Sequence, residues 1–162
     1  MQGFAIAENG HRVISHWPQT ILPNTTVAGD VFSMKEYERA EILISSGDGD
    51  PTTGDGLLTV EACDNVTPDN VTAIPFRLYK GTVSSDLRAA GIAVAATGYT
   101  FLETDNGHWT IEVLARDLPD GKPYLRAVIH SCSGGTVGTP FQCEVLLTGA
   151  RHGGAVPATA IT

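Results

Sequence analysis

Acidic residues in one glycine-rich loop are the first candidates for chemistry. Asp48, Asp50 and Asp55 fall within residues 47–56, and closely spaced carboxylates can supply the oxygen ligands that Ca²⁺ requires. The spacing differs from that of an EF-hand loop, because Pro51 follows Asp50 and no glutamate closes the segment. Aspartate and glycine are also ordinary turn formers, so we predict a solvated turn between two strands and no metal site.

Histidine and cysteine are the next candidates, as metal ligands or as reactive groups. The five histidines are His11, His16, His108, His130 and His152, and the three cysteines are Cys63, Cys132 and Cys143. His130 and Cys132 are two residues apart, but no second pair accompanies them to complete a metal site. Each cysteine sits in an apolar stretch, so we predict reduced thiols that pack in the core of a cytosolic protein.

A serine in the segment Ser131-Cys132-Ser133-Gly134-Gly135 could serve as a nucleophile. The segment does not match the pattern Gly-x-Ser-x-Gly, and it would follow a strand with no helix behind it. It also lacks the lysine of a phosphate-binding loop. We therefore predict a β-turn here, and we expect a protein that is not an enzyme and has no catalytic residue, metal or cofactor.

Aromatic and glycosylation patterns give no stronger signal. Trp17, Trp109 and Tyr79 could stack against a sugar ring, but aromatic residues make up only 7% of the chain and we predict core packing for these rings. Glycosylation triplets begin at Asn24, Asn65 and Asn70. Because residues 1–10 lack the basic start and apolar core of a signal peptide, we interpret these triplets as polar loops.

Length and charge exclude further classes of function. The chain has 162 residues, enough for one domain with its own core. Lys and Arg number 10 against 18 Asp and Glu, a net charge of -8, which disfavours a nucleic acid partner because phosphate binding depends on clustered cations. No apolar run approaches the roughly 20 residues of a membrane helix. Residues 111–162 carry equal numbers of acidic and basic groups, so we expect an uncharged or acidic protein surface to bind there.

Short apolar runs between 18 glycines and 9 prolines are typical of β-strands. We predict eight strands, at residues 12–17, 39–46, 57–63, 73–79, 99–104, 108–115, 124–132 and 141–148. Inward and outward residues alternate along them, as in Ala40, Ile42 and Ile44 against their neighbours. Eight short antiparallel strands favour an all-β sandwich, and we predict the jelly-roll-like type.

One hairpin is predicted in detail. Asn106-Gly107 suits a type I′ turn between residues 99–104 and 108–115, which would place Leu102 opposite Ile111. Trp109 would then lie on the apolar face and Phe101 on the wetter face.

Two further segments allow several structures. Residues 33–37 could form a helical turn with Ser33 as its N-cap. Residues 87–96 are small and apolar apart from Arg88, and could be a short helix, a strand or a loop, although Gly91 disfavours the helix.

Both ends of the chain resemble arms more than parts of a core. We divide the chain into an N-terminal arm (1–10), a β-sandwich domain (11–150) and a C-terminal arm (151–162). The arms carry apolar residues that a solvated tail seldom needs, and we predict partner contacts through Phe4, Ile6, Val156 and Ile161. Solvated, disordered tails are the alternative.

Three short segments resemble tailed-bacteriophage virion proteins. They are Gln2-Gly3-Phe4-Ala5-Ile6-Ala7-Glu8, Gly29-Asp30-Val31-Phe32-Ser33-Met34-Lys35-Glu36-Tyr37 and Ala150-Arg151-His152. In that family an apolar N-terminal arm precedes the pattern Gly-Asp-x-x-Ser-Met/Leu-Lys-x-Tyr and a strand. The resemblance covers both ends and the strand rhythm between them, and no functional residue carries over because the motif marks no reaction.

The likeness is to head decoration, or cement, proteins. It implies a jelly-roll-like domain, often a homotrimer, on the capsid exterior where subunits of the major capsid protein meet. We therefore expect a virion protein made in the host cytoplasm that stabilises the shell by binding adjacent capsomers, without nucleic acid or membrane partners. A tail tube or head–tail adaptor subunit is the alternative, followed by a carbohydrate-binding β-sandwich.

Overall fold

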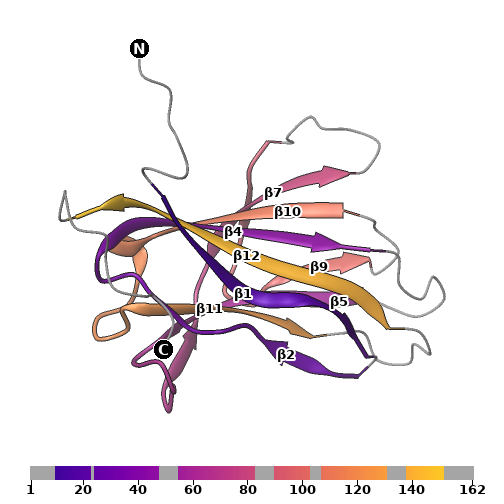
Figure 1. The fold of residues 1–162 in the computed structure, drawn as a ribbon, viewed down its shortest axis with the longest axis horizontal. Coiled ribbons are helices and arrows are strands. Elements are labelled where there is room, and N and C mark those ends of the chain that lie inside the picture. Colours follow the sequence, from indigo (N-terminus) through magenta and orange to yellow (C-terminus); the bar gives the residue numbers. More distant parts are fainter. Residues whose placement is uncertain are drawn as a thin grey trace.

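β-Strands dominate the residues that the computed structural model describes, which are 10–22, 24–47, 55–82, 90–102, 107–130 and 138–151. The strands are β1 (Gly10–Ile21), β2 (Thr26–Ala28), β3 (Phe32–Ser33), β4 (Tyr37–Ser46), β5 (Asp55–Cys63), β6 (Val71–Ala73), β7 (Phe76–Thr82), β8 (Ile92–Val94), β9 (Tyr99–Leu102), β10 (Gly107–Leu114), β11 (Tyr124–His130) and β12 (Thr139–Ala150), and a 3-10 turn, η1 (Ala115–Asp117), follows β10 (Figure 1). The described part of the chain contains no helix with the length and apolar character needed to cross a membrane.

These strands form two antiparallel sheets. In the first sheet six strands run in the order β1-β12-β4-β10-β7-β8. In the second the order is β2-β11-β5-β6, with β3 also paired to β11 and β9 also paired to β5. Side chains from both sheets form one buried cluster, which confirms the predicted all-β antiparallel sandwich.

Alternation along the strands builds this core. Ala40, Ile42 and Ile44 of β4 are at most 1% exposed, whereas Glu41 and Leu43 between them face outward. The same alternation buries Leu58, Val60 and Ala62 on β5 and Phe141, Cys143, Val145 and Leu147 on β12. All eight predicted strands have counterparts in the structure, because a period of two in apolar residues reports directly on which face is buried.

The predicted hairpin of residues 99–104 with 108–115 is wrong. β9 pairs with β5 in the second sheet, whereas β10 lies between β4 and β7 in the first, so the chain crosses from one sheet to the other after Leu102. Phe101, expected on the wetter face, is buried, and its ring centroid lies 5.2 Å from that of Trp109. An Asn-Gly signal favours a turn, but the alternation on its two sides does not say which strands pair.

Three local expectations need correction or completion. Residues 33–37 form a turn without a helix, in which Ser33 Oγ accepts a hydrogen bond from the Lys35 N–H at 3.3 Å. The predicted strand 73–79 is interrupted at Pro75, which has no N–H for a ladder, and becomes β6 and β7. Within residues 87–96 the described part contains β8, a strand.

Several predictions concern residues outside the described part of the chain. Both terminal arms lie there apart from Gly10 and Arg151, and so do the expected partner contacts Phe4, Ile6, Val156 and Ile161. The same holds for Asp48, Asp50, His152 and the segment 131–135 with Cys132.

The edge strand β1 contains two bulges. Its register against β12 shifts between Ile14 and His16 and again between His16 and Gln19. The first shift leaves Ser15 as the extra residue and places His16 opposite the buried Cys143. The Ser15 carbonyl accepts a hydrogen bond from the Asp30 N–H at 2.8 Å, and Ser15 Oγ donates to the Asp30 carbonyl at 3.2 Å. His16 is buried as well, and Gln19 Nε2 lies 2.6 Å from His16 Nε2. At these bulges, polar groups of the edge strand therefore form hydrogen bonds within the domain.

Charged side chains cover the outer face of the first sheet. Arg39 of β4 contacts Glu41 at 2.9 Å and Glu112 of β10 at 3.1 Å. Glu112 also accepts a hydrogen bond from the Tyr79 hydroxyl at 3.1 Å, and Arg12 of β1 pairs with Glu144 of β12. These pairs link β1 to β12, and β4, β10 and β7 to one another, across the face that points away from the core.

The two tryptophans should differ sharply in their contribution to stability. Trp109 is 1% exposed, so Trp109→Ala should lower the free energy of unfolding by about 3–5 kcal/mol through lost burial and the cavity it leaves. Trp17 is 67% exposed, so Trp17→Ala should change it by no more than about 0.5 kcal/mol. Urea denaturation of both variants measures this difference, and equal losses would contradict the assignment of Trp109 to the core.

Acid should destabilise the protein through His16. Burial lowers the pKa of His16 below its usual value of 6.5, an effect that Asp30 partly opposes. The unfolded chain therefore binds the proton more readily, so stability is present above the usual pKa and is lost as pH falls through the lowered one. Between about pH 7 and about pH 5, the melting temperature should fall by more degrees for the wild type than for the His16→Gln variant. An equal fall in both proteins would show that other groups cause the acid sensitivity.

Candidate interaction surface

Some of the residues first considered for catalysis or metal binding lie in the described part of the chain. Among the described residues, no group of three or more His, Cys, Asp and Glu side chains could hold a metal ion. His130 Nδ1 lies 2.9 Å from Thr26 Oγ1, a contact between neighbouring strands. Cys63 and Cys143 are buried, as predicted for core thiols. Burial raises the pKa of Cys63, and it raises that of Cys143 to about 12, which disfavours the reactive thiolate in both.

The three aromatic residues considered for sugar stacking are separated. Trp109 lies in the core, as predicted, whereas the prediction of core packing is wrong for Trp17, which is 67% exposed. Trp17 is on β1 and Tyr79 is on β7, and three strands of the first sheet lie between them. They therefore do not form one platform.

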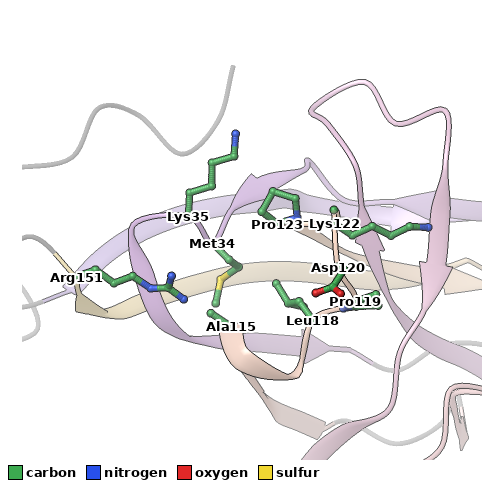
Figure 2. Close-up of a pocket in the computed structure, with 10 residues that line it drawn as sticks. Met34, Lys35, Ala115, Leu118, Pro119, Asp120, Lys122, Pro123 and Arg151 are labelled. Carbon is green, nitrogen blue, oxygen red and sulfur yellow. The ribbon is translucent and has the colours of Figure 1, made fainter.

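A hollow of about 360 Å³ lies at the end of the sandwich where β1 begins and β12 ends. Figure 2 shows its lining, which comes from the turn before β4, from η1 and the segment after it, and from Arg151 just after β12. The lining residues are Met34, Lys35, Ala115, Leu118, Pro119, Asp120, Gly121, Lys122, Pro123 and Arg151. A second hollow of about 270 Å³ shares Ala115 and Arg151 with it. We call these two hollows together the arm-end surface.

Met34 and Lys35 of the segment 29–37 line part of the arm-end surface. The first half of this segment is held against the second sheet, because the Gly29 N–H donates to the Ala127 carbonyl at 2.9 Å. A Cβ on Gly29 would lie 2.3 Å from Ser15 Oγ, so this close approach requires glycine. Further on, the Met34 N–H donates to the Pro123 carbonyl at 2.8 Å, which places the buried Met34 side chain at the base of the hollow.

The end of β12 meets this segment from the other side. Ala150 is paired with Tyr37 in register, and the Arg151 N–H donates to the Glu36 carbonyl at 2.9 Å. Arg151, which the sequence analysis assigned to the C-terminal arm, therefore lines the hollow with Lys35 of segment 29–37 (Figure 2).

Two tight turns after β10 complete the lining. In η1 the Leu118 N–H donates to the Ala115 carbonyl at 3.4 Å, and in the next turn the Lys122 N–H donates to the Pro119 carbonyl at 3.1 Å. Gly121 has φ +77°, which glycine adopts without steric cost. No local pattern in these two turns indicates that they face Met34 and Arg151.

Cations outnumber anions around this surface although the chain is acidic. The linings contain Lys35, Arg116, Lys122 and Arg151 against Glu38 and Asp120. Lys35 Nζ lies 4.9 Å from the centroid of the Tyr124 ring, and Lys122 Nζ donates to Asn70 Oδ1 at 2.7 Å. An apolar base with a cationic rim is suited to a protein surface that presents carboxylates beside apolar side chains. Met34 belongs to a segment that the resemblance singled out, whereas Leu118 was missed because its apolar character gave no functional signal.

The buried thiols should be unreactive in the folded protein. In a Cys132→Ser variant the remaining thiols are Cys63 and Cys143, both inside the core. A thiol reagent at mildly alkaline pH should modify neither until denaturant is added, because the thiolate is the reactive form and burial disfavours it. Rapid modification of the native variant would contradict the burial of these residues.

Comparisons with known proteins give little further information. No family model matches the chain, and no curated protein matches it. Among solved structures, the crystal structure of SPBc2 prophage-derived protein YomS is similar to this chain with a TM-score of 0.47 and 10% sequence identity. The match covers 86% of this chain and 94% of that one. A likeness at this level does not bear on what the chain does.

Proposed function

We propose that this chain is a bacteriophage capsid decoration, or cement, protein that binds the outer surface of the assembled head. In this role it stabilises contacts between subunits of the major capsid protein and resides on the virion exterior. It performs no reaction, and the partner is a protein surface.

The convergence of two distant segments at the arm-end surface carries this proposal. Residues 29–37 and 150–152 are two of the segments that resemble phage virion proteins, and more than 100 positions separate them in the sequence. In the structure the Arg151 N–H donates to the Glu36 carbonyl, and Met34, Lys35 and Arg151 line one hollow. A motif whose parts meet at a surface hollow is better explained by binding than by folding alone.

The strand order supports the jelly-roll-like class that the resemblance implies. β1, β12, β4 and β10 are consecutive in the first sheet, and β2, β11 and β5 are consecutive in the second, with β9 on the far side of β5. A jelly roll has eight strands arranged as two Greek keys, and these eight fit that arrangement. On this interpretation β6, β7 and β8 are an insertion between β5 and β9.

Attachment at several points would strengthen weak individual contacts. Arg151 lines the arm-end surface, and Gly10 at the start of β1 is paired with Thr148 near the same end of β12. We propose that Phe4, Ile6, Val156 and Ile161 contact neighbouring capsid subunits. The arm-end surface would bind an acidic patch on a capsid subunit at the same time. Linked contacts on a regular lattice raise the overall affinity without any single strong contact. Binding to the assembled lattice alone would shift the equilibrium toward intact heads.

A head-binding measurement tests the proposal. Purified protein should sediment with phage heads that lack it and should raise their melting temperature. Arg151→Glu should weaken binding about tenfold or more, because it places a negative charge at the rim that faces the acidic partner.

Arg77→Glu is the matched control, because Arg77 is exposed on β7 and lies outside the lining of the arm-end surface. It should bind heads like the wild type. Failure to bind heads or capsid protein would overturn the proposal, and binding to tail tubes instead would move the protein to the tail.

A further inference from the structure

The start of β1 lies close to the arm-end surface. Gly10 is paired with Thr148, and three residues after Thr148 the side chain of Arg151 lines the hollow. The next residue of β1, His11, has its ring centroid 6.0 Å from that of Tyr37 at the start of β4. Three extended residues span about 10 Å, so the segment that precedes Gly10 is long enough to reach the hollow.

The register of β1 against β12 indicates how that segment could approach. The ladder is antiparallel with Gly10 opposite Thr148, so each step back along β1 corresponds to one step forward along β12. Two further steps in the same register would place Glu8 opposite Ala150 and therefore next to Arg151. A continuation of this ladder thus leads toward the hollow.

The N-terminal arm combines two large apolar side chains with one carboxylate. In an extended segment Phe4, Ile6 and Glu8 share one side, because successive side chains point to opposite sides. Ala5 and Ala7, which are small, share the other side. One side of the arm can therefore present a carboxylate followed by an apolar pair.

The arm-end surface offers the complementary groups. Its base is apolar, with Met34 buried and Leu118 packed against the core cluster. At its rim Arg116 contacts Asp117 at 3.8 Å, whereas Arg151 has no ion pair within the described part of the chain. A carboxylate at Arg151 that is joined to apolar side chains over Met34 and Leu118 would match both features.

Charge and connectivity favour the N-terminal arm over other occupants in the free protein. The C-terminal arm, residues 152–162, contains no acidic side chain that could pair with Arg151. A second copy of the chain carries a net charge of -8 and is repelled by the first. A segment joined to the domain by a short linker acts at an effective concentration on the order of 1 mM, which favours it over a separate molecule.

We infer that in the free protein residues 4–8 dock in the arm-end surface of their own chain. Glu8 pairs with Arg151, and Phe4 and Ile6 cover the apolar base. This inference goes beyond the proposed function and does not depend on it. On a phage head, a capsid carboxylate would compete with Glu8 for Arg151, and the released Phe4 and Ile6 would become available to capsid subunits.

Thiol labelling along the arm of the purified chain tests the inference. Ile6→Cys and, as its matched control, Ala5→Cys are each made in a Cys132→Ser background, in which the other native thiols, Cys63 and Cys143, are buried. Ile6→Cys should react with a thiol reagent at least about tenfold more slowly than Ala5→Cys. Docking shields the side that carries residue 6, and cysteine keeps some of the apolar character of isoleucine.

Charge reversal identifies where the arm docks. Arg151→Glu should remove most of the protection at residue 6, because the new carboxylate repels Glu8, and adding Glu8→Lys should restore the protection. Arg77→Glu should leave it unchanged, since Arg77 is exposed on β7 outside the linings of the arm-end surface. Circular dichroism should show that all variants are folded.

Three outcomes would overturn the inference. One is equal labelling of the Ile6→Cys and Ala5→Cys variants, and another is protection that Arg151→Glu leaves unchanged. The third is protection that increases with protein concentration, because it would place the arm on a second copy. The measurement uses no heads, so its failure would leave the head-binding test of the proposed function unaffected.

Discussion

Packing between Trp109 and Phe101 joins the two sheets across the core. Trp109 is on β10, with β4 and β7 on either side, and Phe101 is on β9 beside β5. The rings meet at a centroid distance of 5.2 Å and an angle of 48°. Gly56 lies opposite Phe101 in register, and a Cβ there would be 2.4 Å from the ring. Because interiors are close-packed, this contact fixes how the sheets sit and therefore where their ends and edges lie.

The periodicity of the sequence was sufficient to predict the strands and which of their faces is buried. It was not sufficient to predict which strands pair. Residues such as Ile42, Val60 and Val145 were assigned correctly because burial on one face needs only local alternation. The partner of β9 could not be deduced, because pairing depends on contacts between segments that are distant in sequence. The short strands β2 and β3 were missed, and β8 was only one of several structures allowed for residues 87–96, since two or three residues cannot show a period.

The arm-end surface and the exposed position of Trp17 were predictable to different degrees. Segment 29–37 was singled out by resemblance, but only the fold brings it to Arg151 and to the turn after η1. Trp17 was expected in the core because tryptophan usually packs there. The two bulges of β1 change which side chains face the core, and no local pattern announces a bulge. Surface sites that are built from bulges and chain crossings are therefore harder to predict from the sequence than the core residues are.

The antiparallel pairing of β1 with β12 has a mechanical consequence. Gly10 is opposite Thr148, so the chain enters β1 and leaves β12 at the same end of the ladder. Tension applied outward through both flanking segments would load this ladder in an unzipping geometry, in which the pairs separate one after another rather than all together. The hydrogen bond from Arg151 to Glu36 and the pairing of Ala150 with Tyr37 anchor the β12 side to β4. The weaker side under load is therefore β1, whose first pairs would peel away before the core is disturbed.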